Sequence, residues 1–303
     1  MLKIAFIVHG KCRARKQLLE DIQHNFGSDF MVGIFETTHY QHSIELGKKA
    51  ADERYDYIIS CGGDGTLNET LNGIMQSANR EVKLGVLPHG SGNDFIKTVQ
   101  SSDTVEGLRK LIDDHRIRRI DIGLSEYISP HREPAKRYFI NITDIGLGGV
   151  IAEQLFGSKK FFGPTLTYQY YILKNLITYS PKPIIIEADS FNYAGRVMNF
   201  CAANAKYFGS GLGVSPQSDI SDGLLNAIAV GNIGLLDYFK HLPAIKKCLP
   251  IQHPEVKYYT AREIKFSSTI RDMPVDMDGE FIGYLPMKVT VIPAAIDFIC
   301  MAS

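Results

Sequence analysis

A short glycine-rich loop that carries one carboxylate is the segment of this sequence that points most directly to chemistry. Residues 57–66 read Tyr-Ile-Ile-Ser-Cys-Gly-Gly-Asp-Gly-Thr, an apolar strand that runs into Gly62–Gly65. Glycines let backbone N–H groups approach a ligand closely, and a helix that follows the loop directs its positive end toward an anion. Thr66 and Glu69 have the spacing of a capping box, which predicts that this helix starts at Thr66. We therefore predict a phosphate site, with an ordinary strand-to-helix turn as the alternative.

A second glycine-rich loop, Pro88-His-Gly-Ser-Gly-Asn-Asp-Phe95, follows the next predicted strand. Neighbouring strands of a parallel sheet end at the same edge, so both loops should border one cleft. Asp64 and Asp94 are then two carboxylates that can hold Mg²⁺ directly or through its waters. Neither loop matches G-x-x-x-x-G-K-[ST] or G-x-G-x-x-G, so those two phosphate-binding motifs are absent.

The elements that must position these loops alternate between strand and helix over the first 120 residues. The apolar patterns predict strands at 2–8, 30–35, 57–61 and 82–87. Helices are predicted at 18–26, 44–51 and 67–78, with a further helix that starts near Asp103. Repeated strand and helix units indicate an α/β domain with a mostly parallel sheet.

The pattern changes beyond residue 120, where strands follow one another closely. Strands are predicted at 120–127, 137–143, 184–188, 196–202, 224–230, 256–266 and 288–292, with helical insertions at 165–179 and 235–247. Few crossover helices separate these strands, so we expect an antiparallel, β-rich sandwich. The segment 161–179 is aromatic and apolar, which suits either a core helix or an element that contacts a membrane.

Composition narrows the functional classes. The chain has 303 residues, with 33 basic and 33 acidic side chains, so no overall charge would attract nucleic acid. Its five cysteines are widely spaced and lack a C-x-x-C pair, which argues against a disulfide framework and a cysteine zinc site. We find no signal peptide and no run of about 18 apolar residues. We expect a cytoplasmic protein, with peripheral contact at the inner face of the cell membrane as a further expectation.

Several motifs together resemble the soluble lipid kinases that share the diacylglycerol kinase catalytic domain, which include bacterial diacylglycerol kinases and sphingosine and ceramide kinases. The matching segments occur in the order of that family and span most of the chain: Gly62-Gly-Asp-Gly-Thr-Leu-Asn-Glu-Thr-Leu-Asn-Gly73, Pro88–Phe95, Asp121-Ile-Gly123, Asn141-Ile-Thr-Asp-Ile-Gly146, Asp219-Ile-Ser-Asp-Gly-Leu224 and Asp278-Gly-Glu280. NAD kinases share the first motif, whereas the second loop and the late Asp-Gly-Glu are more specific.

The resemblance implies an ATP-binding α/β domain over 1–121 with a return at about 294–303, a β-rich lipid-substrate domain over 122–293, and an active site between them. The residues implied to contact or shape the nucleotide phosphates are Gly62, Gly63, Gly65, Thr66, Gly90, Ser91, Gly92 and Asn93. Those implied to form a magnesium and water network are Asp64, Asp94 and Asp121. A separate structural Mg²⁺ site is implied at Asp219, Asp222 and the carbonyl of Leu224, although such a sequence is also common in turns.

The implied reaction is ATP- and Mg²⁺-dependent transfer of a phosphoryl group to a lipid hydroxyl, with diacylglycerol or a related lipid as acceptor. Glu280 matches the proposed general base, and Asp278 and Asp64 are the other candidates. The alternatives are an NAD kinase-like enzyme and a nucleotide-binding regulator without turnover. The expected partners are a lipid substrate and a membrane surface but no nucleic acid, and a homodimer is left open.

Overall fold

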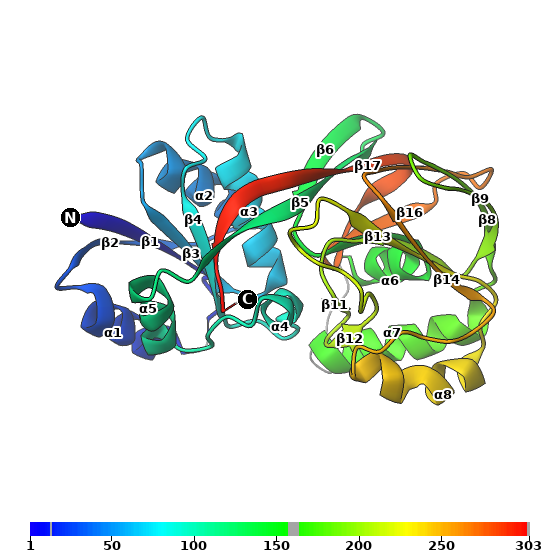
Figure 1. Ribbon diagram of the computed structural model, residues 1–303, viewed down its shortest axis with the longest axis horizontal. Coiled ribbons are helices and arrows are strands. Elements are labelled where there is room, and N and C mark those ends of the chain that lie inside the picture. The colour runs from blue at the N-terminus through cyan, green and yellow to red at the C-terminus, as the bar shows by residue number, and fades with distance from the viewer. Residues whose placement is uncertain (13, 157–163, 302–303) are drawn as a thin grey trace. The chain divides into compact units, whose positions relative to one another are not determined.

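The computed structural model describes residues 1–12, 14–156 and 164–301 of the chain. Its internal contacts divide it into two compact units, residues 1–120 with 294–303 and residues 121–293 (Figure 1). Two strands pass from one unit to the other: β5 (Ile117–Ile128) leaves the first unit, and β17 (Glu280–Ile299) returns to it. The first unit is therefore discontinuous in sequence.

A parallel sheet forms the centre of the first unit. Its strands lie in the order β2 (Phe30–Glu36), β1 (Leu2–Val8), β3 (Tyr57–Gly62) and β4 (Lys83–Pro88). The end of β17 adds a fifth parallel strand, because Asp297 and Phe298 pair with Lys83 and Leu84 of β4. The predicted α/β class is confirmed for this unit.

Two pairs of helices pack against this sheet. Helices α1 (Arg15–Phe26) and α5 (Val105–Asp113) share one apolar cluster with the strand residues Ile4, Phe6 and Val8. Helices α2 (His42–Asp52) and α3 (Asp64–Gln76) pack against each other and against β1 and β3. Residues that alternate along a strand face opposite sides of the sheet, which explains why β1 is apolar at consecutive positions.

One predicted helix start in this unit is wrong. Helix α3 starts at Asp64 with Gly63 as its N-cap, so Thr66 lies inside the first turn and forms no capping box. The carboxylate of Asp64 is thereby placed at the positive end of the helix, where it is stabilised. Helix α5 does start near Asp103, as predicted, and its N-cap is Thr104, whose hydroxyl accepts the Gly107 N–H at 3.1 Å. The short helix α4 (Asp94–Val99) was not predicted.

The second unit is β-rich and antiparallel, as predicted. One row of strands has the order β14 (Val256–Ala261), β13 (Leu225–Val230), β10 (Asn199–Ala203), β7 (Ile142–Gly146), β16 (Pro274–Met277) and β17. A second row joins β17 to β15 (Glu263–Ser267), β8 (Lys182–Ala188) and β9 (Asn192–Val197). Further strands are β6 (Pro134–Phe139), which pairs with β5, and the short hairpin β11 (Tyr207–Phe208) and β12 (Leu212–Gly213).

The core of this unit is filled by side chains from both rows. Phe200 of β10 meets Phe266 of β15 edge-on, with ring centroids 5.6 Å apart, inside one buried apolar cluster. Three predicted strands, 137–143, 196–202 and 256–266, are each broken into two strands. At the first break, the carboxylate of Asp278 takes the backbone N–H groups of residues 140–142, so these groups do not join a sheet ladder.

Three helices lie together in the second unit: α6 (Leu147–Leu155), α7 (Pro164–Thr178) and α8 (Leu235–Lys246). Their inner sides share an apolar cluster around Ile151, Ile172, Leu176 and Met198. The predicted helices 165–179 and 235–247 are confirmed, whereas α6 was not predicted. Residues 161–163 of the apolar stretch lie outside the described residues. None of the helices in the described ranges is both long and apolar enough to cross a membrane.

Candidate functional site

The two glycine-rich loops of the first unit lie at adjacent strand ends, as the sequence predicted. Gly62 at the end of β3 is in register with Pro88 at the end of β4, and the His89 N–H donates to the Gly62 carbonyl at 2.8 Å. The loops also touch through their glycines. A Cβ atom added to Gly90 would lie 2.3 Å from the Cα of Gly63, so a side chain at residue 90 would push the loops apart.

Asp64 ties the first loop to the second. Its Oδ1 accepts the backbone N–H groups of Asp94 at 2.9 Å and Phe95 at 3.1 Å, which are the first two residues of α4. The same carboxylate belongs to the first turn of α3. One side chain therefore lies at the N-termini of two helices, where donor groups without helical partners and the helix dipoles favour negative charge.

Asp64 and Asp94 form a pair of neighbouring carboxylates. Their Oδ2 atoms lie 3.1 and 3.6 Å from the position that a Cβ of Gly92 would take. Burial, and then the charge of Asp94, raise the pKa of Asp64, and the two backbone donors oppose that rise. The Lys97 ammonium group donates to Asp94 Oδ1 at 2.7 Å and to the Gly92 carbonyl at 3.1 Å, so one cation already lies beside the pair.

Asn93 gives the second loop its shape. It adopts a left-handed conformation with φ of 50°, its Oδ1 accepts the Gly90 N–H at 3.0 Å, and its Nδ2 donates to the Gly90 carbonyl at 2.9 Å. Both ends of its amide are thus used within the loop. Thr66 is buried beneath the first loop, where a Cβ added to Gly62 would lie 2.3 Å from its hydroxyl oxygen. These two residues shape the loops rather than project from them.

The first-unit loops fit a phosphate group with a magnesium ion. Mg²⁺ prefers a small number of carboxylate oxygens and completes its shell with water and phosphate oxygens. The Oδ2 atoms of Asp64 and Asp94 both lie near Gly92, which has no side chain of its own to fill the space beside them. Burial and the neighbouring Asp94 charge raise the pKa of Asp64, and a divalent cation held by the two carboxylates would oppose that rise.

In the second unit, Asp278 and Gly279 form the turn between β16 and β17. Both have positive φ, 48° and 85°, which is the conformation that favours an Asp-Gly pair in a two-residue hairpin. The buried carboxylate of Asp278 accepts the N–H groups of Ile140, Asn141 and Ile142 at 3.0, 3.0 and 2.9 Å. This carboxylate holds the hairpin against the junction of β6 and β7.

Glu280 follows this turn and forms an ion pair with Arg137 of β6. Its Oε2 lies 2.9 Å from Nη2 of Arg137, and the side chains are 26% and 9% exposed. Glu280 is therefore the more accessible of the two carboxylates in the Asp-Gly-Glu motif, since Asp278 is buried. Its partner is a nearly buried guanidinium group that sequence reasoning did not identify.

Asp121 lies beside the loop that was predicted to bind a structural metal. Its Oδ2 accepts the Gly223 N–H at 2.7 Å, and the charges of Asp219 and Asp121 contribute, after burial, to raising the pKa of Asp222. Asp222 Oδ1 accepts the Leu224 N–H at 2.9 Å, and Asp219 Oδ1 accepts the Ser221 N–H at 3.0 Å. These bonds are typical of turns, so metal binding here stays a prediction.

Asp144 and Asp276 form a buried carboxylate pair that sequence reasoning missed. They face each other across β7 and β16, and both side chains are at most 2% exposed. Oδ1 of each has no hydrogen-bond partner among the described residues. Burial raises the pKa of Asp144 to about 7. Burial and the charges of Asp144, Asp278 and Glu280 raise the pKa of Asp276 well above its ordinary value.

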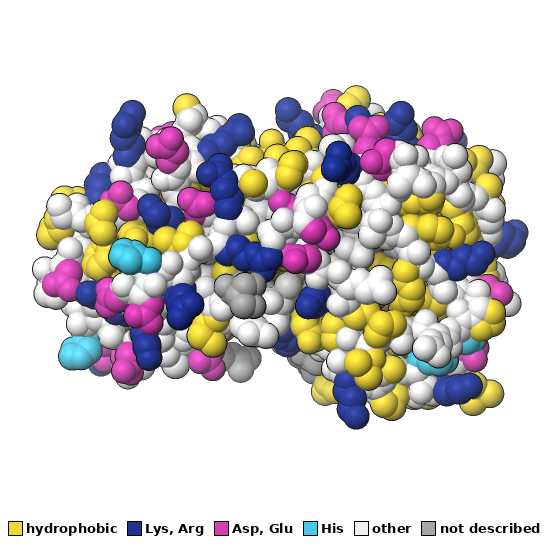
Figure 2. All heavy atoms as spheres, in the orientation of Figure 1, with side chains coloured by type: hydrophobic (Ala, Val, Ile, Leu, Met, Phe, Trp, Pro, Cys, Tyr) yellow, Lys and Arg dark blue, Asp and Glu magenta, His cyan; other side chains and the backbone are white. Residues whose placement is uncertain are grey.

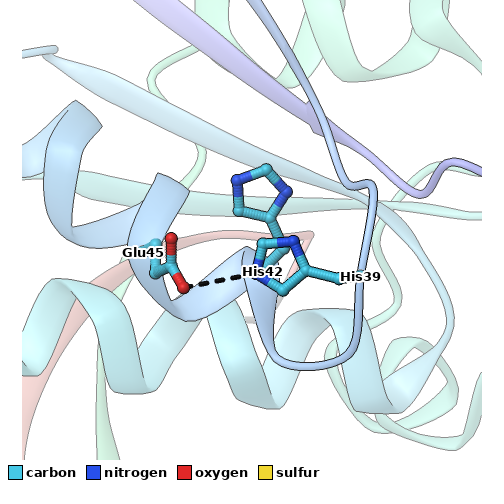
Figure 3. Close-up of side chains that lie close together, drawn as sticks. All are labelled: His39, His42 and Glu45. Atoms are coloured by element: carbon cyan, nitrogen blue, oxygen red, sulfur yellow. Dashed lines mark hydrogen bonds and ion pairs between the residues drawn. The ribbon is translucent and has the colours of Figure 1, made fainter.

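Among the described residues, one group of three side chains has metal-binding atoms close to one another: His39, His42 and Glu45 (Figure 3). The two imidazole rings are stacked, with centroids 4.2 Å apart and planes 18° from parallel. Histidine binds metals through lone pairs that lie in the ring plane, so stacked rings do not direct both nitrogens at one ion. His39 instead contacts Glu45, with Nε2 and Oε1 3.3 Å apart.

Four side chains near the predicted site residues were not predicted: Lys97, Arg137, Asp144 and Asp276. Lys97 follows Asp94 at the i, i+3 spacing of a helix, so the prediction of α4 would have identified it. Asp144 and Asp276 stand inside apolar strands, where a charged residue is unusual and indicates a functional or paired group. Arg137 offered no such signal.

Two family models match the chain. Residues 3–125 match the diacylglycerol kinase catalytic domain, and residues 146–300 match the YegS C-terminal NAD kinase beta sandwich-like domain. A diacylglycerol kinase of Staphylococcus carnosus is 31% identical over 246 residues, which cover 79% of this chain and 74% of that protein. A diacylglycerol kinase of Staphylococcus aureus strain Newman is 30% identical over 253 residues, which cover 82% of this chain and 76% of that protein.

Solved structures share the fold at lower sequence identity. A crystal structure of a candidate diacylglycerol kinase from Bacillus anthracis superposes with a TM-score of 0.79 and 21% identity, over 98% of this chain and 96% of that one. Yeast NADH kinase in complex with NADH superposes with a TM-score of 0.55 and 10% identity, over 100% of this chain and 84% of that one. At these identities the likeness concerns the fold alone.

Proposed function

Because this chain belongs to the diacylglycerol kinase family, we propose that it is a lipid kinase, which uses ATP and Mg²⁺ to phosphorylate a lipid hydroxyl. Diacylglycerol is the first acceptor to test, because it is the lipid in the names of the relatives. The chemistry of such a transfer is mainly alignment and charge neutralisation of the phosphates, which a rigid pair of backbone loops can provide.

The observation that carries this proposal is the joint between the two glycine loops. Asp64 fixes the start of α4 through two backbone hydrogen bonds, and Gly63 and Gly90 meet without side chains. Helix α3 begins at this joint, and a helix N-terminus preceded by a glycine loop favours an anion. We propose that the phosphates of ATP bind at residues 62–66 and 90–93.

Asp64 and Asp94 would hold Mg²⁺, which when bound offsets the negative charge of the phosphates. Lys97 positions Asp94 through its 2.7 Å contact and adds a further positive charge to the second loop. In a site that excludes water, positioned charges of this kind contribute more to catalysis than they would in bulk solvent.

We propose Glu280 as the group that accepts the proton of the lipid hydroxyl. The three backbone donors on Asp278 support a positioning role for that residue instead. Asp64 stays the second candidate for the base, because its raised pKa suits a carboxylate that takes up a proton. General-base catalysis of this kind contributes about 10²- to 10⁴-fold to the rate.

The direct test is phosphate transfer to defined acceptors. The purified chain is incubated with ATP and Mg²⁺, in separate reactions with diacylglycerol, a total lipid extract and NAD, and the products are examined by mass spectrometry. We expect one added phosphate on a lipid and none on NAD. Asp64→Ala should abolish the transfer while its circular dichroism spectrum matches wild type, and the exposed Asp103→Ala should retain it. Phosphorylated NAD, or normal turnover by a folded Asp64→Ala variant, would contradict the proposal.

A further inference from the structure

Helix α7 exposes a continuous apolar stripe. Leu166, Tyr170, Leu173 and Ile177 are exposed by between 37% and 69%. Their spacings of four, three and four residues place them on one side of the helix. At a rise of 1.5 Å per residue the stripe is about 16 Å long. Scattered exposed apolar residues are ordinary, but a continuous row on one helix face is the feature of a contact surface.

This stripe is not a displaced core face, because the opposite side of α7 is already packed. Ile172 and Leu176 are buried in the cluster that α6, α7 and α8 share. The buried Asn175 holds α7 to α6, with its Nδ2 donating to Gln154 Oε1 at 2.9 Å. The helix is therefore apolar on both sides, and only one side has a partner within the described residues.

Helix α8 extends the apolar surface. It packs beside α7, and its Leu235 and Tyr238 contact the shared cluster. Leu236 and Phe239 point to solvent instead, and Leu236 is 86% exposed. Figure 2 shows hydrophobic side chains over α8 and the neighbouring α7, with lysine or arginine side chains beside them. We call the six exposed residues the α7–α8 face: Leu166, Tyr170, Leu173, Ile177, Leu236 and Phe239.

The charges around the α7–α8 face are mainly positive. The exposed basic residues of the two helices and the residue after them are Lys174, Lys240, Lys246 and Lys247. None of them has an ion-pair partner in the part of the chain that the structure describes. The one acidic residue, Asp237, is used within the unit, because its Oδ2 accepts the Gly234 N–H at 3.1 Å. The whole chain is neutral, so this positive charge is a local excess.

We propose that the α7–α8 face binds the surface of a bilayer that contains anionic lipid. The inference rests on the proposed function, in which the acceptor is a lipid. Helices with an apolar side and lysines beside it lie in the plane of the interface, and anionic headgroups attract the lysines. The rings of Tyr170 and Phe239 suit the boundary between headgroups and acyl chains. The face thus brings the enzyme to its substrate without spanning the membrane.

The test is flotation of the full chain with vesicles of phosphatidylcholine, with and without phosphatidylglycerol, in the absence of ATP. We expect binding to be at least about tenfold stronger with the anionic lipid, because each of the four nearby lysines adds to the attraction. Ile177→Ser combined with Leu236→Ser should reduce binding by about tenfold or more. Ile185→Thr, an exposed apolar residue on β8 of the same unit, is the matched control and should bind as wild type does.

The charge component has its own pair of variants. Lys240→Gln with Lys247→Gln removes two of the four lysines and should reduce the preference for anionic vesicles several-fold, whereas Lys257→Gln on β14 should leave it unchanged. This experiment measures vesicle binding and not turnover. A chain without kinase activity can therefore still bind vesicles, and an active kinase can fail to bind them. Absence of wild-type binding, or equal binding by the Ile177 and Leu236 double variant, overturns the proposal. A third outcome also overturns it: the wild-type chain is a dimer that does not bind vesicles, and the same double variant is a monomer. A second copy of the chain would then cover the face.

Discussion

The buried pair of Asp144 and Asp276 should make the second unit more stable in mild acid than at alkaline pH. The folded state raises the pKa of Asp144 from 3.8 to about 7, mainly by burial. Between these two values the folded protein holds a proton that the unfolded chain has released. The free energy of unfolding therefore falls as the pH rises from about 4 to about 7, and the loss is complete above the folded pKa.

The size of this effect follows from the shift. One pKa unit corresponds to about 1.36 kcal/mol, so the rise from 3.8 to about 7 amounts to about 4 kcal/mol at pH 8. Asp144→Asn removes the ionisation and keeps an oxygen that can accept the Asn199 Nδ2 group, which now donates to Oδ2 at 3.3 Å. We expect this variant to lie within about 1 kcal/mol of wild type near pH 4.5 and to exceed its stability by up to about 4 kcal/mol at pH 8.

The measurement is urea unfolding of both proteins from pH 4.5 to 8.5, followed by the near-ultraviolet dichroism of tyrosine, since the chain contains no tryptophan. Glu187→Gln removes an exposed carboxylate of the same unit and is the control, whose pH profile should parallel wild type. A difference between Asp144→Asn and wild type that does not change with pH would refute the reasoning. So would a variant that is less stable than wild type at pH 8.

Four further substitutions test the site. Gly90→Ala should weaken ATP binding about tenfold or more in a folded protein, because the new Cβ would lie 2.3 Å from the Gly63 Cα. Isothermal titration calorimetry measures the affinity, and an unchanged affinity would refute the importance of this contact. Asp278→Ala should lower the free energy of unfolding by about 1–3 kcal/mol or more, since three backbone N–H groups lose their acceptor. Glu280→Gln should instead lower kcat about 10²-fold or more and leave the urea midpoint near wild type. Lys97→Met should raise the KM for ATP at an unchanged melting temperature, because the second loop loses its cation, and an unchanged KM would exclude that role.

The parts of the fold that the sequence predicted are those that depend on local pattern. Buried parallel strands read as apolar runs, and glycines mark where the chain leaves them, so the position of both loops could be inferred. The start of α3 could not be inferred in this way. Thr66 and Glu69 match a capping box, and Gly63 with Asp64 matches a helix start equally well. Local signals compete there, and packing at the sheet edge decides between them.

The roles of the candidate site residues in the second unit depend on contacts between distant parts of the chain. Asp278 and Glu280 were identified, but the role of Asp278 follows from N–H groups of residues 140–142, whose place beside the turn depends on strand order. The pairing of Asp144 with Asp276 follows from the register of β7 and β16, which neither strand specifies alone. Helix α7 shows a related ambiguity, because Ile172 and Ile177 are equally apolar and only packing separates the buried from the exposed residue.

The return of β17 to the first unit has a consequence for protein synthesis. Phe298 lies beside Phe95, with ring centroids 5.2 Å apart, and Phe95 is the residue whose N–H binds Asp64. On the ribosome, the N-terminal residues emerge with the edge of β4 unpaired and with the second glycine loop lacking that aromatic support. The first unit can thus complete its fold only after the whole second unit has been translated. Nascent chains that stop before β17 leave the edge of β4 exposed, so they would need protection from aggregation.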